Sequence, residues 1–119
     1  MKEMIYTKNE TCEILYEGFY KDYKFYIYNY GPTPCAYIEV PKGHKLYEVH
    51  YMNIEDVYPH GGFTFSKHSL RDYHTDNWIL GWDYAHADDY FPYLSDDGKK
   101  WTTKEIYEEV KRVIEEVNK

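Results

Sequence analysis

The segment YKFYIYNYGPTPCAYIEV, residues 23–40, decides the fold of this chain. Its first half alternates Phe25 and Ile27 with tyrosines, and its second half alternates Ala36 and Ile38 with other residue types. A period of two is typical of a strand with one face in the core. Two prolines and a glycine within residues 31–34 predict a turn. The segment therefore predicts an antiparallel hairpin of strands 23–30 and 35–40.

Further strands are predicted on both sides of this hairpin. Residues 12–16 form a short candidate, residues 62–66 alternate phenylalanine with threonine, and residues 78–83 carry tryptophan and leucine at inward positions. Residues 46–57 predict a loop with one helical turn. Residues 71–77 and 93–100 are polar, which favours loops.

The C-terminal segment predicts a helix. Thr102 and Glu105 have the spacing of a capping box, in which each side chain bonds the other residue's backbone amide. Apolar residues then recur at helical spacing: Ile106, Val110, Val113, Ile114 and Val117. The opposite face is charged and is interpreted as solvated: Glu108, Glu109, Lys111, Arg112, Glu115 and Glu116. The predicted fold class is α+β, an antiparallel sheet of four to five strands packed against one long C-terminal helix.

Size and charge restrict the partners that this chain can have. A length of 119 residues predicts a single domain, residues 1–119. The formal net charge is −7, and a duplex nucleic-acid binder needs a basic face, so we expect no duplex partner. A compact phosphorylated ligand is compatible with this negative charge, because backbone amides can bind its phosphate without a basic surface. The 16 tyrosines indicate a half-buried sheet, a ligand cleft or a self-association face, hence a possible homo-oligomer.

The cysteines and the apolar runs bear on location. Cys12 and Cys35 are far apart and form no CxxC pair, so we expect reduced thiols. The first residues carry no apolar core of signal-peptide length, and no run approaches the length of a membrane span. We therefore expect a cytoplasmic protein without a membrane partner.

Two short glycine-containing segments carry candidate ligand-binding residues. The segment Pro41-Lys42-Gly43-His44 follows a predicted strand, where Lys42 and His44 can meet a carboxylate or phosphate. In His60-Gly61-Gly62, the amides of Gly61 and Gly62 can point into one concavity and hold an anion. Exposed loops and tight turns are the ordinary alternatives for both segments.

A third segment, GWDYAHADD at residues 81–89, pairs a carboxylate with an imidazole. Asp83 and His86 are three residues apart and share a face if the chain turns helically there. A carboxylate beside an imidazole suits a general base or a metal ligand. Together with His60 or His44 they supply three ligands, which is the number a catalytic divalent metal needs, although the spacing matches no metal signature. A divalent metal cofactor is thus possible, with His60, Asp83 and His86 as candidate ligands.

As a set, the segments at residues 37–47, 60–65 and 81–90 resemble a group of small proteins encoded by bacteriophages and prophages, chiefly in Gram-positive bacteria. The pattern of that group is PKGHPLY, HGGxT[FY] and GFDxAHxGD. This chain differs in Lys45, Trp82 and Asp88, so that Asp89 becomes the matching acid. The resemblance runs from about residue 25 to residue 90 and implies an origin rather than a defined activity.

These observations favour a protein that binds a nucleotide-sized polar ligand in a pocket of histidine, aspartate and aromatic side chains. Small phage proteins often act against host defence, so the resemblance implies a possible counter-defence sponge for nucleotide messengers. We expect His44, His60, Asp83 and His86 to converge on one hollow. The predicted ligand-binding residues are Lys42, His44, Gly61, Gly62, Thr64, Trp82 and Asp89.

Two alternatives remain open from the sequence. One is a metal-dependent or histidine-based phosphodiesterase or other hydrolase, with His60, His86 and Asp83 as catalytic residues. The other is an inhibitor that binds a host protein through an exposed tyrosine face, because tyrosine is enriched at such interfaces.

Overall fold

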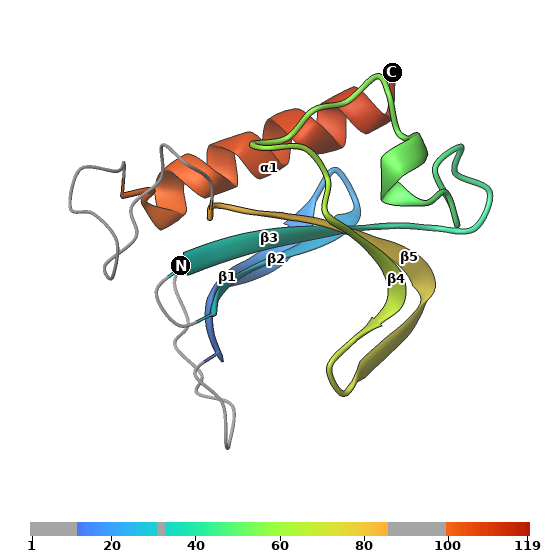
Figure 1. The fold of residues 1–119 in the computed structure, drawn as a ribbon. Helices are drawn as coiled ribbons and strands as arrows, with labels where there is room; N and C mark the ends of the chain where they lie inside the picture. The colour runs from blue at the N-terminus through green and yellow to red at the C-terminus, as the bar shows by residue number, and fades with distance from the viewer. Residues whose placement is uncertain (1–11, 31–32, 86–99) are drawn as a thin grey trace.

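A computed structural model describes residues 12–30, 33–85 and 100–119 of the chain (Figure 1). It confirms the predicted α+β class, with five strands, one 3₁₀ turn at Tyr51–Asn53 and one long helix. The strands and the helix are, in order, β1 Cys12–Tyr20, β2 Tyr23–Tyr30, β3 Thr33–Val40, β4 Phe65–Leu70, β5 Tyr73–Asp83 and α1 Thr103–Val117.

All strand pairs are antiparallel, and the order across the sheet is β1-β2-β3-β5-β4. The predicted hairpin of β2 and β3 is confirmed, with Phe25 opposite Ile38 and Ile27 opposite Ala36. Because β5 pairs with β3, the β4–β5 hairpin is added beside the first three strands, and α1 crosses one face of the sheet (Figure 1).

The main core lies between the sheet and α1. The five apolar helix residues predicted from the spacing are all fully buried, and they pack on the inward residues of β2, β3 and β5. The helix begins with the predicted capping box, since the Glu105 amide donates to Thr102 Oγ1 at 3.1 Å and the Thr102 amide donates to Glu105 Oε1 at 3.0 Å. The two reciprocal bonds satisfy backbone donors that otherwise lack a partner at a helix start.

The structure corrects several predicted boundaries. The strand predicted at 12–16 continues to Tyr20, and the strand predicted at 62–66 occupies Phe65–Leu70. Thr33 and Pro34, predicted in a turn, already pair with β2. The predicted turn of residues 31–32 and the predicted loop of residues 93–99 lie outside the described residues. The helical turn predicted within 46–57 is confirmed.

The loop predicted at residues 71–77 is wrong, because β5 begins at Tyr73. Tyr73, Thr75 and Asn77 all donate to the buried carboxylate of Glu39, so their polar groups belong inside the fold. Their polarity therefore reflects a buried partner rather than exposure to solvent.

The sheet face opposite α1 is called the distal face here. The β4–β5 hairpin bends away from α1 (Figure 1), and its Tyr73 reaches Glu39 of β3 at 2.7 Å. A second cluster of buried residues lies on this face: Tyr26, Cys35, Tyr37, Leu70 and Ile79. The distal face is therefore built largely of aromatic side chains.

Candidate ligand-binding site

A row of residues crosses the distal face from β2 to β4. It runs from Tyr26 through Tyr37 and Gly81 to Phe65, each opposite the next in the strand register. The rings of Tyr26 and Tyr37 stack with centroids 5.5 Å apart, and Tyr37 meets Phe65 edge-on at 5.4 Å. These distances suit favourable ring pairs, so β2, β3 and β4 contribute the rings of one aromatic row that passes over Gly81 of β5.

A hollow of about 350 Å³ lies at one end of this row and contains the carboxylate of Asp83. Thr64 Oγ1 donates to Asp83 Oδ2 at 3.2 Å, and the Ala85 amide donates to Oδ1 at 3.1 Å. These two bonds orient the Asp83 carboxylate, whose oxygens act as acceptors. The lining residues are Thr33, Cys35, Tyr37, Thr64, Phe65, Trp82, Asp83 and Ala85.

A second hollow on the distal face, of about 480 Å³, is lined in part by Glu39. Glu39 is only 2% exposed. Its Oε2 accepts from the hydroxyls of Tyr26 at 3.2 Å and Tyr73 at 2.7 Å, and its Oε1 accepts from Thr75 at 3.4 Å and Asn77 at 3.0 Å. Four donors fill the acceptor capacity of a carboxylate. Glu39 therefore holds the β4–β5 hairpin in place.

Lys24 completes this network at the edge of the second hollow. Its Nζ donates to the Tyr73 hydroxyl at 3.2 Å and lies 4.6 Å from the centre of the Tyr73 ring. Burial opposes the charge of Lys24, but the Tyr73 bond and the charge of Glu39 outweigh it, and the pKa of Lys24 is raised. Burial and the Glu39 charge also raise the pKa of Tyr26. Lys24 is therefore a cation and Tyr26 a neutral donor.

His60 lies on the other side of the sheet, against α1. Its ring stacks on Tyr84 with centroids 4.8 Å apart and planes inclined by 8°, and its backbone amide donates to Glu109 at 2.8 Å. Glu109 also accepts from the Tyr84 hydroxyl, and burial followed by this bond raises the pKa of Tyr84. Successive strand residues point to opposite faces, so Tyr84 with His60 and Asp83 lie on opposite sides of β5.

His44 lies near the end of α1 at Asn118. Its Nε2 is 3.1 Å from Asn118 Oδ1, and its Nδ1 accepts from the Leu46 amide at 3.0 Å. His60 contacts Glu109, nine positions earlier, which corresponds to about 13 Å along a helix. The structure therefore places His44 and His60 in different locations rather than around one hollow.

The remaining predicted residues have varied surroundings. Lys42 is exposed in the loop after β3. Gly61 and Gly62 have φ of 72° and 85°, and the Gly62 amide donates to the Pro59 carbonyl at 2.8 Å, which closes a tight turn. Thr64 lines the same hollow as Asp83. Trp82 also borders this hollow, but its side chain is 1% exposed and lies in the core on the α1 side, where Nε1 donates to the Tyr84 hydroxyl.

His86 and Asp89 lie outside the described residues. Within the described part of the chain, no group of three or more histidine, cysteine, aspartate or glutamate side chains is arranged to hold a metal ion. The possible metal set of His60, Asp83 and His86 therefore stays a prediction, and its two described members face opposite sides of the sheet.

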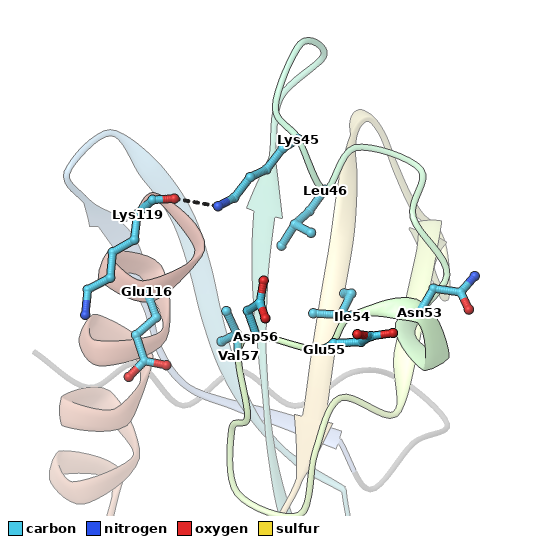
Figure 2. Close-up of a pocket in the computed structure, with 9 residues that line it drawn as sticks. All are labelled: Lys45, Leu46, Asn53, Ile54, Glu55, Asp56, Val57, Glu116 and Lys119. Atoms are coloured by element: carbon cyan, nitrogen blue, oxygen red, sulfur yellow. Dashed lines mark hydrogen bonds between the residues drawn. The ribbon is translucent and has the colours of Figure 1, made fainter.

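A third hollow, of about 610 Å³, lies beside the C-terminal end of α1 (Figure 2). Its wall combines the apolar Leu46, Ile54 and Val57 with acidic and basic side chains. Lys45 Nζ donates to the Lys119 carbonyl at 2.5 Å across one side of it. The wall contains no aromatic ring, so a flat ligand would find no stacking partner there, unlike in the hollow at Asp83.

Three residues of these networks were not singled out from the sequence. The sequence predicts Glu39 in a strand, Tyr73 in a loop and Glu109 on the solvated face of the helix, although the Glu109 side chain is only 15% exposed. One signal pointed to Glu39: it shares the alternating face of Cys35 and Tyr37, and both are buried. Helical spacing separates Glu109 from its exposed neighbour Glu108. Glu109 lies three residues after Ile106 and four before Val113, at the border of the apolar stripe, whereas Glu108 lies opposite that stripe.

No protein-family model, curated protein or solved structure matches this chain. The resemblance to small phage proteins therefore rests on the three sequence segments alone. In the described residues, no helix has both the length and the apolar character needed to cross a membrane.

Proposed function

We propose that this protein binds a small ligand with a flat, amino-bearing ring, of the size of a nucleotide, in the hollow at Asp83. The observation that carries the proposal is an oriented carboxylate beside the aromatic row, in a hollow of about 350 Å³. Small-ligand pockets commonly begin at about 300 Å³ and combine apolar walls with a few placed polar groups.

The chemistry of the lining suggests how such a ligand binds. A base stacks on the half-buried Phe65 and donates from its exocyclic amine to Asp83, which is flanked by the hydroxyl of Thr64. Lys67 lies 5.7 Å from the Phe65 ring centre and supplies a cation for a phosphate. The role that agrees with the phage resemblance is sequestration of a nucleotide messenger in the host cytoplasm.

The hydrolase alternative gains no support from the described residues, because His60 and Asp83 lie on opposite sides of β5. The host-protein inhibitor stays a prediction. The binding experiment below separates a hydrolase from the proposed ligand binder through product signals.

The test is amide chemical-shift mapping by NMR with AMP, CMP, GMP, UMP, cyclic dinucleotides and ADP-ribose. We expect AMP, CMP or GMP to shift the amides of residues 64–65 and 81–85. UMP is expected to bind more weakly, because uracil carries a carbonyl where cytosine carries the amine. No shift with any nucleotide at millimolar concentration contradicts the proposal, and product signals in the same samples would identify a hydrolase instead.

Two variants locate the site. Asp83→Asn keeps the shape and leaves Thr64 a partner, but it removes the charge, so we expect about tenfold weaker binding or more. Phe65→Ala removes the stacking surface, for which about 1–3 kcal/mol is typical. The matched control is Asp72→Asn in the exposed β4–β5 turn, which we expect to bind as the unaltered protein does. Equal weakening by Asp83→Asn and Asp72→Asn would indicate non-specific charge effects.

A further inference from the structure

The β4–β5 ladder contains an irregularity at His68. Strand pairs are present at Lys67–Ile79 and at Ser69–His74. Between these pairs β4 contributes one residue, His68, whereas β5 contributes four. The longer strand must therefore bulge at this point, and a bulge leaves backbone groups without ladder partners.

The ring of His68 makes two hydrogen bonds at this bulge, one to β5 and one to the loop before β4. Its Nδ1 lies 2.8 Å from the carbonyl oxygen of Asn77, and its Nε2 lies 2.8 Å from Glu48 Oε2. A carbonyl and an ionised carboxylate can only accept, so both ring nitrogens must donate. An imidazole that donates from both nitrogens carries a positive charge. The geometry therefore describes an imidazolium, packed edge-on against Trp78 at 4.9 Å.

The Glu48 partner belongs to the connection between β3 and β4. Glu48 has φ of 60°, in the left-handed region that a β-carbon disfavours, so its conformation needs outside contacts. Trp78 Nε1 donates to the neighbouring Val49 carbonyl at 2.9 Å, and this bond does not depend on pH near neutrality. The His68–Glu48 pair is the titratable connection between this loop segment and the bulge.

We propose that His68 is a pH-operated latch that ties the loop of residues 47–49 to the β5 bulge. As an imidazolium it holds Glu48 and the Asn77 carbonyl together. When it loses its proton, one ring nitrogen can no longer donate and one of the two bonds breaks. The Asn77 side chain donates to Glu39 on the distal face, so the latch and the Glu39 network hold the bulge from its two sides.

Groups around the ring determine the direction of the response. The charged group that faces His68 from the loop is Glu48. The ring of Tyr47 also contacts His68, with centroids 5.6 Å apart, and the Tyr47 hydroxyl donates to the Asp76 carbonyl. The ammonium of Lys67 lies over the Phe65 ring on the distal face. The bond to Glu48, followed by the bond to the Asn77 carbonyl, raises the pKa of His68, and partial burial opposes this.

The experiment is NMR of the imidazole nitrogens across pH, with no ligand present, so its result is separate from the ligand-binding proposal. At about pH 6 we expect both His68 nitrogens to carry protons, and loss of the proton at a higher pH than for the free side chain. The amides of residues 47–49 and 75–78 should shift with the same midpoint, and hydrogen exchange of residues 47–49 should accelerate above it.

Glu48→Gln removes the charge but retains an acceptor, so we expect the His68 midpoint to fall. The matched control is Glu55→Gln, an exposed glutamate in the same β3–β4 connection, which should leave the midpoint unchanged. His68→Gln keeps a donor that does not titrate, and it should abolish the pH-dependent part of the exchange. A neutral His68 ring at about pH 6, or a titration that leaves residues 47–49 and 75–78 unaffected, would overturn the proposal.

Discussion

The ring of Tyr37 lies across Gly81 on the neighbouring strand. A β-carbon at Gly81 would stand 2.4 Å from Tyr37 Cδ1 and 2.6 Å from Cε1, which is well inside van der Waals contact. Tyr37 has little freedom to move aside, because it stacks on Tyr26 and meets Phe65 edge-on. The aromatic row of the distal face therefore depends on a glycine at this position.

Gly81→Ala should destabilise the protein by about 1–3 kcal/mol, the usual cost of overpacking a core. The matched control is Gly18→Ala in β1, where the added β-carbon would meet Phe25 at 3.7 Å, an ordinary contact distance. We expect this control to be neutral or slightly stabilising. Urea unfolding measures both, and equal effects of the two changes would contradict the close approach of Tyr37.

Glu109→Ala should cost about 2–3 kcal/mol, because it removes the acceptor of the buried Tyr84 hydroxyl and of the His60 amide. Its neighbour gives the control: Glu108 has a side chain that is 58% exposed and pairs only with Lys111 among the described residues. Glu108→Ala should change the free energy of unfolding by less than about 0.5 kcal/mol. Similar losses of stability for both variants would show that Glu109 behaves as a solvated residue and that its bonds to Tyr84 and His60 do not stabilise the fold.

Tyr73→Phe should lower stability by about 1.5–3 kcal/mol, the typical value for a hydrogen bond to a charged group. The change deprives Glu39 of one donor and Lys24 of its acceptor. Tyr23→Phe is the control, since its hydroxyl bonds Asn118 at an exposed site and should contribute about 1 kcal/mol or less. A neutral Tyr73→Phe would show that the hairpin is held in place without the Glu39 network.

The latch also predicts how stability depends on pH. The folded pKa of His68 is raised, so its contribution is complete below the ordinary value of 6.5 and is lost as pH rises through the folded pKa. Unfolding by urea from about pH 6 to pH 9 should therefore show a decline that His68→Gln does not share. Parallel curves for the two proteins would argue against this linkage.

Local patterns predicted much of the fold. The alternation of residues 23–40 placed Phe25 and Ile38 on the core side, and the spacing after Thr102 gave the buried face of α1. Both patterns succeed because burial of one face follows from the side-chain periodicity of a strand or a helix. The prediction of a loop at residues 71–77 was wrong, because polar residues there bond the buried Glu39 and are not exposed as a loop would be.

The candidate site was predicted only in part. Thr64 and Asp83 do line one hollow, whereas the side chain of Trp82 lies in the core on the α1 side. His44 contacts the end of α1, and His60 lies across the sheet from Asp83. Sequence proximity of reactive residues indicates that they are available, but strand alternation decides on which face each one lies.

The sequence by itself determined the hairpin of β2 and β3, the helix with its cap and the inward face of each, because these depend on residues close together in the chain. Tertiary structure alone decided that Tyr37 covers Gly81, that Tyr73 reaches Glu39, and that Glu109 receives the Tyr84 hydroxyl. These partners are 44, 34 and 25 residues apart in the chain. Their meeting depends on strand register, on the bend of the β4–β5 hairpin and on where α1 docks, which no local pattern specifies.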